Sequence, residues 1–190
     1  MAYLGEIVDT INAALKAKLT AFPLSGYTGI VYSLPRKKGT GFEYLPAQIS
    51  ISGDAKWITF DDVNELQVYH RIASSTYTPI RKQSYGDGYD VFQHNYDLDL
   101  VVMADRRKVQ VEPDVLEAAI ASNMPVSTSI QGVSNINILS VSANHNSRSL
   151  FSQEFQGTDY FLKPEHIFFS IRYRVELQYQ KGCLNLCQCN

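Results

Sequence analysis

The sequence predicts an α+β domain in which an antiparallel or mixed β-sheet packs against an N-terminal helix and a second helix near residues 113–123. Two kinds of pattern lead to this class. Several long stretches alternate apolar and polar side chains, as half-buried strands do, and two stretches repeat apolar residues every three or four positions, as amphipathic helices do. A chain of 190 residues buries roughly 70% of its unfolded surface, so one domain with its own core is expected.

The clearest strand signal is the stretch 166–180 near the C-terminus. The odd-numbered positions from 169 on are apolar: Phe169, Ile171, Tyr173, Val175, Leu177 and Tyr179. The even-numbered positions between them are polar: Ser170, Arg172, Arg174, Glu176 and Gln178. This alternation predicts a strand with one face on the core and one face in water. At about 3.4 Å per residue the alternating part spans roughly 35–45 Å, so we expect it to bend across the sheet or to extend beyond the domain.

A second strand is predicted at 91–103, where apolar and polar residues also alternate. Asp97 and Asp99 fall on its polar face, and Arg172 and Arg174 fall on the polar face of the C-terminal strand. If the two strands are antiparallel neighbours, ion pairs between these four residues set the register of the sheet. Such cross-strand pairs contribute roughly 0.2–1 kcal/mol each.

The two helices are expected at 3–19 and 113–123. Apolar residues of the first helix recur at helical spacing: Leu4, Ile7, Val8, Ile11, Ala14, Leu15 and Leu19. Its acidic residues lie early and its lysines late, which complements the helix dipole. For the second helix, Pro113 suits the first turn, and Asn123 with Pro125 predicts the end.

Further strands are expected at 27–34, 48–52, 57–60, 65–72 and 136–141. The first three of these predict a small antiparallel sheet with a mobile, basic tip at 35–41. The polar stretch 74–90 is expected to be a long loop or a hairpin insertion, because structureless connections of this length are uncommon in compact domains. The whole predicts a single domain over 1–180, followed by a cysteine-containing tail at 181–190.

The sequence predicts no catalytic, cofactor-binding or metal site, and we expect neither an enzyme nor a cofactor. The four histidines are His70, His94, His145 and His166. They are scattered, with no cysteine or carboxylate at ligand spacing. Glycines at 39–41 and 86–88 lack the context of a phosphate-binding loop and are typical of turns. Cys183, Cys187 and Cys189 lack the fourth ligand and the spacing of a zinc site.

The formal net charge is −2, so the chain has no overall basic field to attract nucleic acid. Two local basic clusters consist of Arg36, Lys37 and Lys38, and of Arg106, Arg107 and Lys108. Both are typical of solvated turns; their functional alternative is contact with DNA phosphates that pass through a ring. No apolar run approaches the ~20 residues of a membrane span, and no signal pattern opens the chain, so folding in the cytoplasm is expected.

This order of elements resembles the tail terminator and neck-ring proteins of tailed bacteriophages, including those of crAss-like phages and of related contractile systems. The resemblance rests on the N-terminal helix, the strand ending near Met103, the helix at 113–123 and the C-terminal strand. The segment 155–166, which leads into that last strand, is also similar. The resemblance covers nearly the whole chain as a pattern of elements. It implies a small subunit that forms a ring, commonly a hexamer or dodecamer, between the portal or connector and the tail tube.

On this resemblance we expect a structural virion protein of the neck or tail, assembled in the host cytoplasm. The expected partners are copies of the same chain, the portal or connector, and tail-tube or adjacent neck proteins, with non-specific contact to passing DNA and no membrane. Contacts are expected at 35–41, 74–90, 142–165 and after Gln180.

Two alternatives remain open at this point. One is a baseplate or tube-capping component of a contractile or secretion system. The other is a small cytoplasmic enzyme whose site is assembled from scattered residues, which a polar pocket around His70 or His94 would favour.

Overall fold

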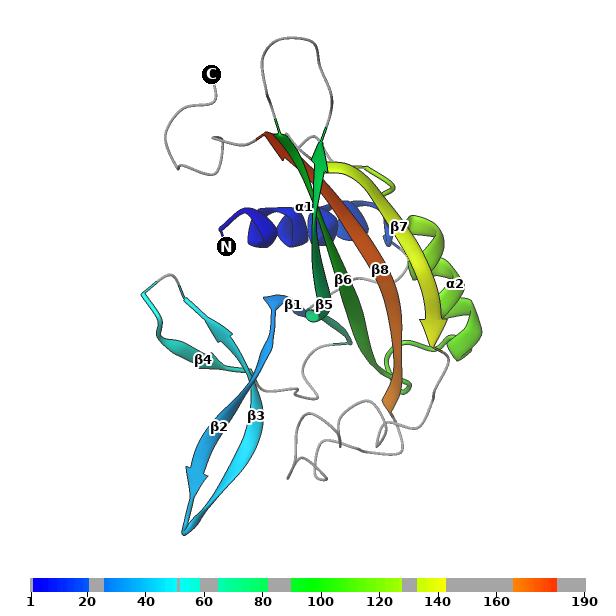
Figure 1. The fold of residues 1–190 in the computed structure, drawn as a ribbon. Helices are drawn as coiled ribbons and strands as arrows, with labels where there is room; N and C mark the ends of the chain where they lie inside the picture. The colour runs from blue at the N-terminus through cyan, green and yellow to red at the C-terminus, as the bar shows by residue number, and fades with distance from the viewer. Residues whose placement is uncertain are drawn as a thin grey trace.

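The computed structural model describes residues 2–20, 26–50, 52–58, 65–81, 90–127, 133–142 and 166–180. Within these ranges the predicted α+β class is confirmed: two helices accompany a five-stranded mixed sheet and a three-stranded antiparallel sheet (Figure 1). The elements are α1 Ala2–Lys18, β1 Gly26–Ile30, β2 Tyr32–Lys38, β3 Gly41–Ile49, β4 Ala55–Trp57, β5 Leu66–Arg81, β6 Asp90–Asp105, α2 Pro113–Asn123, β7 Val133–Ser142 and β8 His166–Gln180.

The five-stranded sheet has the order β1-β5-β6-β8-β7. β1 is parallel to β5, and every other neighbouring pair is antiparallel. The two strongest predicted strands, β6 and β8, lie side by side, with Asp105 opposite His166 at one end and Val91 opposite Gln180 at the other. Because side chains alternate along a strand, this register puts the apolar residues of both strands on the same face of the sheet.

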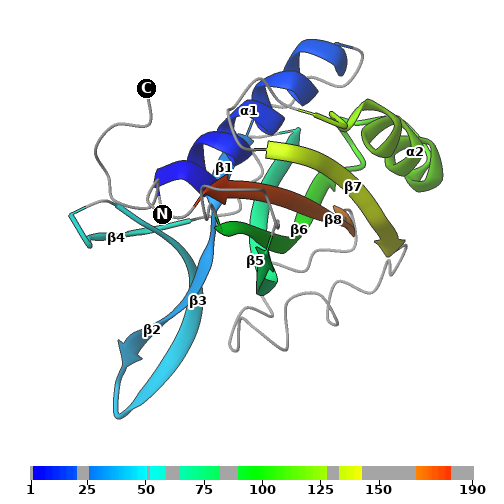
Figure 2. The same ribbon diagram turned by 45° about the horizontal axis from the view of Figure 1, so that its top comes forward.

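Both helices cover that apolar face (Figure 2). The main core joins Ile7, Ile11 and Leu15 of α1 and Leu116 and Ile120 of α2 to Leu98, Leu100, Phe169, Ile171, Tyr173 and Val175 of the sheet. The apolar stripe of α1 is buried as its spacing predicts. α2 begins at Pro113, after an extended Glu112, and ends at Asn123. A proline at the first helical position loses no hydrogen bond, so this start agrees with the sequence prediction.

The three-stranded sheet, β2-β3-β4, forms an arm that projects from the domain (Figure 1). The predicted mobile loop at 35–41 is wrong for most of its length, because β2 continues through Lys38 and pairs with β3 as far as Gly41. Only Gly39 and Thr40 turn the chain. Gly39 has φ +60°, the left-handed conformation that two-residue hairpin turns require and glycine adopts at low cost.

The stretch predicted as one strand at 27–34 is divided at Val31, since β1 pairs with β5 whereas β2 pairs with β3. The strand predicted at 48–52 instead occupies Gly41–Ile49, and the one at 57–60 corresponds to Ala55–Trp57. Alternation is weak in these segments because the strands are short and carry prolines at 35 and 46. The arm leaves the main sheet through Val31, which is buried and whose amide donates to the carbonyl of His70 at 2.8 Å.

The predicted insertion at 74–90 begins and ends as paired strands. β5 continues to Arg81, β6 starts at Asp90, and the two remain in register from Ser74 opposite Asp97 onwards. A bulge between Ile72 and Ser74 separates this extension from the buried part of β5. Residues 82–89 lie outside the described residues, as do 143–165, with His145, and 181–190, with the three cysteines.

We expect the substitution Phe169→Ala to lower the free energy of unfolding by roughly 3–5 kcal/mol, because it removes a fully buried ring from the centre of the core. Val126→Ala, after α2, is the control. That side chain is 74% exposed, so its truncation should change stability by less than about 0.5 kcal/mol. Urea unfolding followed by circular dichroism measures both values, and equal losses would contradict this description of the core.

Candidate functional site

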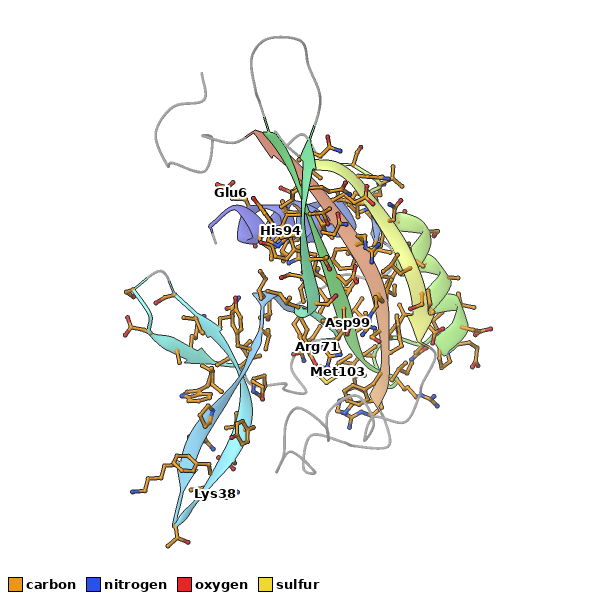
Figure 3. The ribbon with its side chains drawn as sticks, viewed as in Figure 1. Glu6, Lys38, Arg71, His94, Asp99 and Met103 are labelled. Carbon is orange, nitrogen blue, oxygen red and sulfur yellow. The ribbon has the colours of Figure 1, made fainter. Side chains whose placement is uncertain are left out.

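A network of ion pairs lies on the face of the main sheet opposite the helices, and it brings the four predicted register residues together. Asp99 accepts two hydrogen bonds from Arg172, at 2.7 and 3.0 Å, and a third from Arg71 on β5. Asp97 accepts two from Arg174, at 2.7 and 3.1 Å, and one from Ser74 at 3.0 Å. Figure 3 shows Arg71 and Asp99 on the neighbouring strands.

The two carboxylates of this network differ in their surroundings. Asp99 is 2% exposed, and its burial opposes ionisation, but the hydrogen bonds from Arg172 and Arg71 outweigh burial and lower its pKa. Asp97 is more open, and its pKa is lowered first by the hydrogen bond from Arg174. Sequence reasoning missed Arg71. The available signal was its place on the polar face of the strand predicted at 65–72.

A buried polar chain links α1 to the main sheet on the helix-covered face. Nδ1 of His70 lies 2.7 Å from the hydroxyl of Tyr173, and Nε2 lies 2.8 Å from Oδ1 of Asn12. Because an amide oxygen only accepts, Nε2 carries the proton and Nδ1 accepts from the tyrosine. Burial lowers the pKa of His70 from 6.5 to about 3 and raises the pKa of Tyr173, so both groups are neutral at pH 7.

The two histidines on which the enzyme alternative depends have different environments. Both ring nitrogens of His70 are occupied by the hydrogen bonds to Asn12 and Tyr173 within the core. His94 lies beside two aromatic rings: its centroid is 3.9 Å from that of Tyr96 and 5.8 Å from that of Tyr77. Partial burial lowers the pKa of His94. Both arrangements are typical of packed histidines.

The two predicted basic clusters occupy separate parts of the fold. Arg36, Lys37 and Lys38 lie near the end of the arm, whereas 106–108 form the turn after β6. Glu43 on β3 accepts from Arg36, and Nζ of Lys38 lies 3.0 Å from its Oε2. The hydrogen bond from Lys38, followed by the one from Arg36, lowers the pKa of Glu43.

In the turn after β6, Arg107 donates to both carboxylate oxygens of Asp105, at 2.9 and 2.7 Å. This pairing lowers the pKa of Asp105 to about 2. Arg107, Arg36 and Lys38 therefore have acidic partners within the chain. This reduces the positive charge that either cluster presents to DNA phosphates.

The two faces of the arm differ in exposure. Leu45 and Ala47 are buried on one face, where the guanidinium of Arg36 lies 5.9 Å from the centre of the Trp57 ring. The opposite face carries Phe42, 69% exposed, and Tyr44, 41% exposed. Sequence reasoning missed these two aromatic residues because it assigned no strand to 41–47. A signal was present in the aromatic residues on either side of Glu43.

A second apolar surface lies along β7, the edge strand at the other end of the main sheet. Ile138, Leu139 and Val141 are each at least 40% exposed. The ten residues Val133–Ser142 contain no charged side chain and no proline. Natural edge strands usually carry charged residues or proline, because these residues prevent pairing with another chain. Among the described residues, this edge is interrupted only by irregularities in its pairing with β8, between Val133 and Asn135 and between Ile138 and Ser140.

The base of the arm lies close to α1. A shallow open depression there is lined by Asp9, Asn12, Ala13, Lys16, Gly29 and Gln48. A Cβ atom added at Gly29 would lie 3.1 Å from Nε2 of Gln48, so a larger residue at that position would displace the end of the Gln48 side chain. The depression separates the helix from the root of the arm.

No protein-family model matches the chain, and no curated protein matches its sequence. Within the described residues, no group of three or more His, Cys, Asp or Glu side chains is arranged to hold a metal ion. Among the helices described here, none is long and apolar enough to cross a membrane.

We expect a double-mutant cycle to give a coupling free energy of about 0.2–1 kcal/mol for Asp97 with Arg174, as for other solvent-accessible pairs. The cycle for Asp99 with Arg172 should give more, because Asp99 is desolvated. Asp99→Asn alone should cost roughly 2–3 kcal/mol, since it weakens hydrogen bonds from two arginines at a buried site. Denaturant unfolding measures each value. Zero coupling in both cycles would show that these pairs do not set the register.

Acidification should destabilise the fold through His70. Between pH 6.5 and about 3 the unfolded chain protonates this residue and the folded chain does not, so stability falls as pH falls through this window. The expected loss is roughly 1 kcal/mol per pH unit. Unfolding measured between pH 7 and 5, above the range in which carboxylates titrate, separates the histidines from the carboxylates.

The variant His70→Gln keeps a donor and an acceptor without a titrating ring, so most of the pH dependence between pH 7 and 5 should disappear. His94→Gln is the matched control, because it removes a partly exposed histidine and should leave most of that dependence. A wild-type slope that survives in His70→Gln would assign the effect to another group.

Proposed function

We propose that this chain is a structural subunit that assembles into a ring in the neck or tail of a tailed bacteriophage, between the portal or connector and the tail. The observation that carries the proposal is the arm. It projects from the domain (Figure 1), and its side chains Phe42 and Tyr44 are exposed. Beyond the pairing of β4 with 47–49, the arm is a two-stranded ribbon. Such a ribbon is marginally stable by itself in water, so the end of the arm gains stability when a partner covers it.

A second feature supports assembly through repeated contacts. The arm leaves the main sheet from β1, at one end of the strand order, and the uncharged edge strand β7 lies at the other end. Surfaces at opposite ends of a subunit favour contacts in which the front of one copy meets the back of the next. Such contacts form a closed ring when the rotation between copies completes a circle.

The basic residues of the arm give the proposal a secondary part, which is contact with DNA inside the ring. Side chains of Arg36 and Lys38 are 48% and 67% exposed but share Glu43 as their partner. The remaining positive charge suits weak, sequence-independent contact with phosphates of passing DNA, because tight binding would hinder its passage. The virion location and the portal or tail partners follow from the resemblance described above and belong to the same proposal.

The mass of the purified protein in solution, measured by light scattering alone and with portal and tail proteins added, tests the ring. We expect either a closed oligomer or a monomer that joins an oligomer on its partner. A chain that remains monomeric with every virion partner would overturn the proposal. Assembly on baseplate or secretion-system components instead would support the alternative, a baseplate or tube-capping component of a contractile or secretion system.

A further inference from the structure

We infer that the outer edge of β3 at the end of the arm pairs with the outer edge of β7 in a second copy of this chain. This inference rests on the proposed ring and specifies the contact that builds it. The pairing extends the main sheet of one copy with the arm hairpin of the next. Main-chain hydrogen bonds supply the contact, and the exposed apolar side chains of the two edges are buried together.

The described part of β7 has an outer edge along which a second strand can be added, on either side of the irregularity between Ile138 and Ser140. Its inner side bonds to β8, and near its start the amide of Ile136 donates to the carbonyl of Val126 at 3.0 Å. Beyond that point, no described strand pairs with the outer side of residues 137–142. Leu139 and Val141, 44% and 40% exposed, lie in this segment. Its backbone polar groups and apolar side chains both gain from an added strand.

The two edges of the arm differ in their ability to pair with another strand. β2 carries Pro35, which has no amide hydrogen, and ends in Lys37 and Lys38. Proline and lysine are residues that protect an edge from pairing. β3 beyond its contact with β4 lacks both: β4 pairs only with 47–49, and no described strand pairs with the outer side of 41–45. The edge of β3 is therefore the one that can accept a strand.

A second copy is the occupant that fits both edges. The segment 41–45 of β3 and the segment 137–142 of β7 have similar lengths, and both expose large apolar side chains. The single charged residue between them, Glu43, is already neutralised by Arg36 and Lys38 within its own arm. Pairing therefore buries no unpartnered charge. Because the strand order separates β7 from the arm, the two edges meet between copies (Figure 2).

Two variants with exposed substitutions test the pairing. Phe42→Lys with Tyr44→Lys disables the arm, and Leu139→Lys with Val141→Lys disables the β7 edge. Each variant by itself should be monomeric by light scattering, with the circular dichroism of the wild type. Val115→Lys with Val126→Lys is the matched control: it also adds two positive charges, at apolar side chains that are 49% and 74% exposed in and after α2, and it should assemble like the wild type.

Mixing the two defective variants gives the decisive result. The intact arm of the β7 variant can dock on the intact edge of the arm variant, and no further copy can be added at either end. The mixture should therefore contain a one-to-one dimer with twice the monomer mass. A mixture that stays monomeric, or a variant that still forms the wild-type oligomer alone, would overturn the inference. Contact of arm with arm, or of edge with edge, would appear as a homodimer of one variant.

Failure of this inference is distinguishable from failure of the proposed function. Wild-type protein that assembles into a ring through other surfaces, or only on a portal or tail partner, would overturn the β3–β7 pairing and leave the ring proposal standing. Wild-type protein that remains monomeric under all of these conditions would overturn both.

Discussion

The pairing of β6 with β8 determines how the rest of the structure is arranged. These two strands run in register from Asp105 opposite His166 to Val91 opposite Gln180, and a shift by one residue would turn every apolar side chain of one strand away from the helices. The same register that buries Phe169 and Leu100 places Asp99 against Arg172 on the other face. Core packing and cross-strand charge pairing therefore favour one and the same alignment.

The hydrogen-bonded chain through His70 fixes the orientation of α1 on the sheet. Apolar contacts alone would allow α1 to slide or rotate on the sheet at small cost, whereas hydrogen bonds from His70 to Asn12 and from Tyr173 to His70 have directional requirements. These bonds join α1, β5 and β8 at one point. An unsatisfied partner at this depth would cost about 1–3 kcal/mol, so alternative placements of the helix are disfavoured.

Most of the main domain could be predicted from the sequence because its elements are long and strongly patterned. The alternation in β6 and β8, the spacing in α1 and the proline that opens α2 each indicate one structure. The arm could not be predicted equally well, since its strands are short, contain prolines and are stabilised by pairing with each other. Periodicity also gives no information on strand order, so the third partner of the ion network, Arg71, and the edge position of β7 emerged only from the topology.

The connection between the arm and the main sheet has a mechanical consequence. Only Val31 separates β1 from β2, and it is buried and bonded to the backbone of His70. The arm is thus a continuation of a sheet strand and not a flexible tether. A force applied to the arm through β2 therefore acts directly on the hydrogen bond of Val31 and on the pairing of β1 with β5.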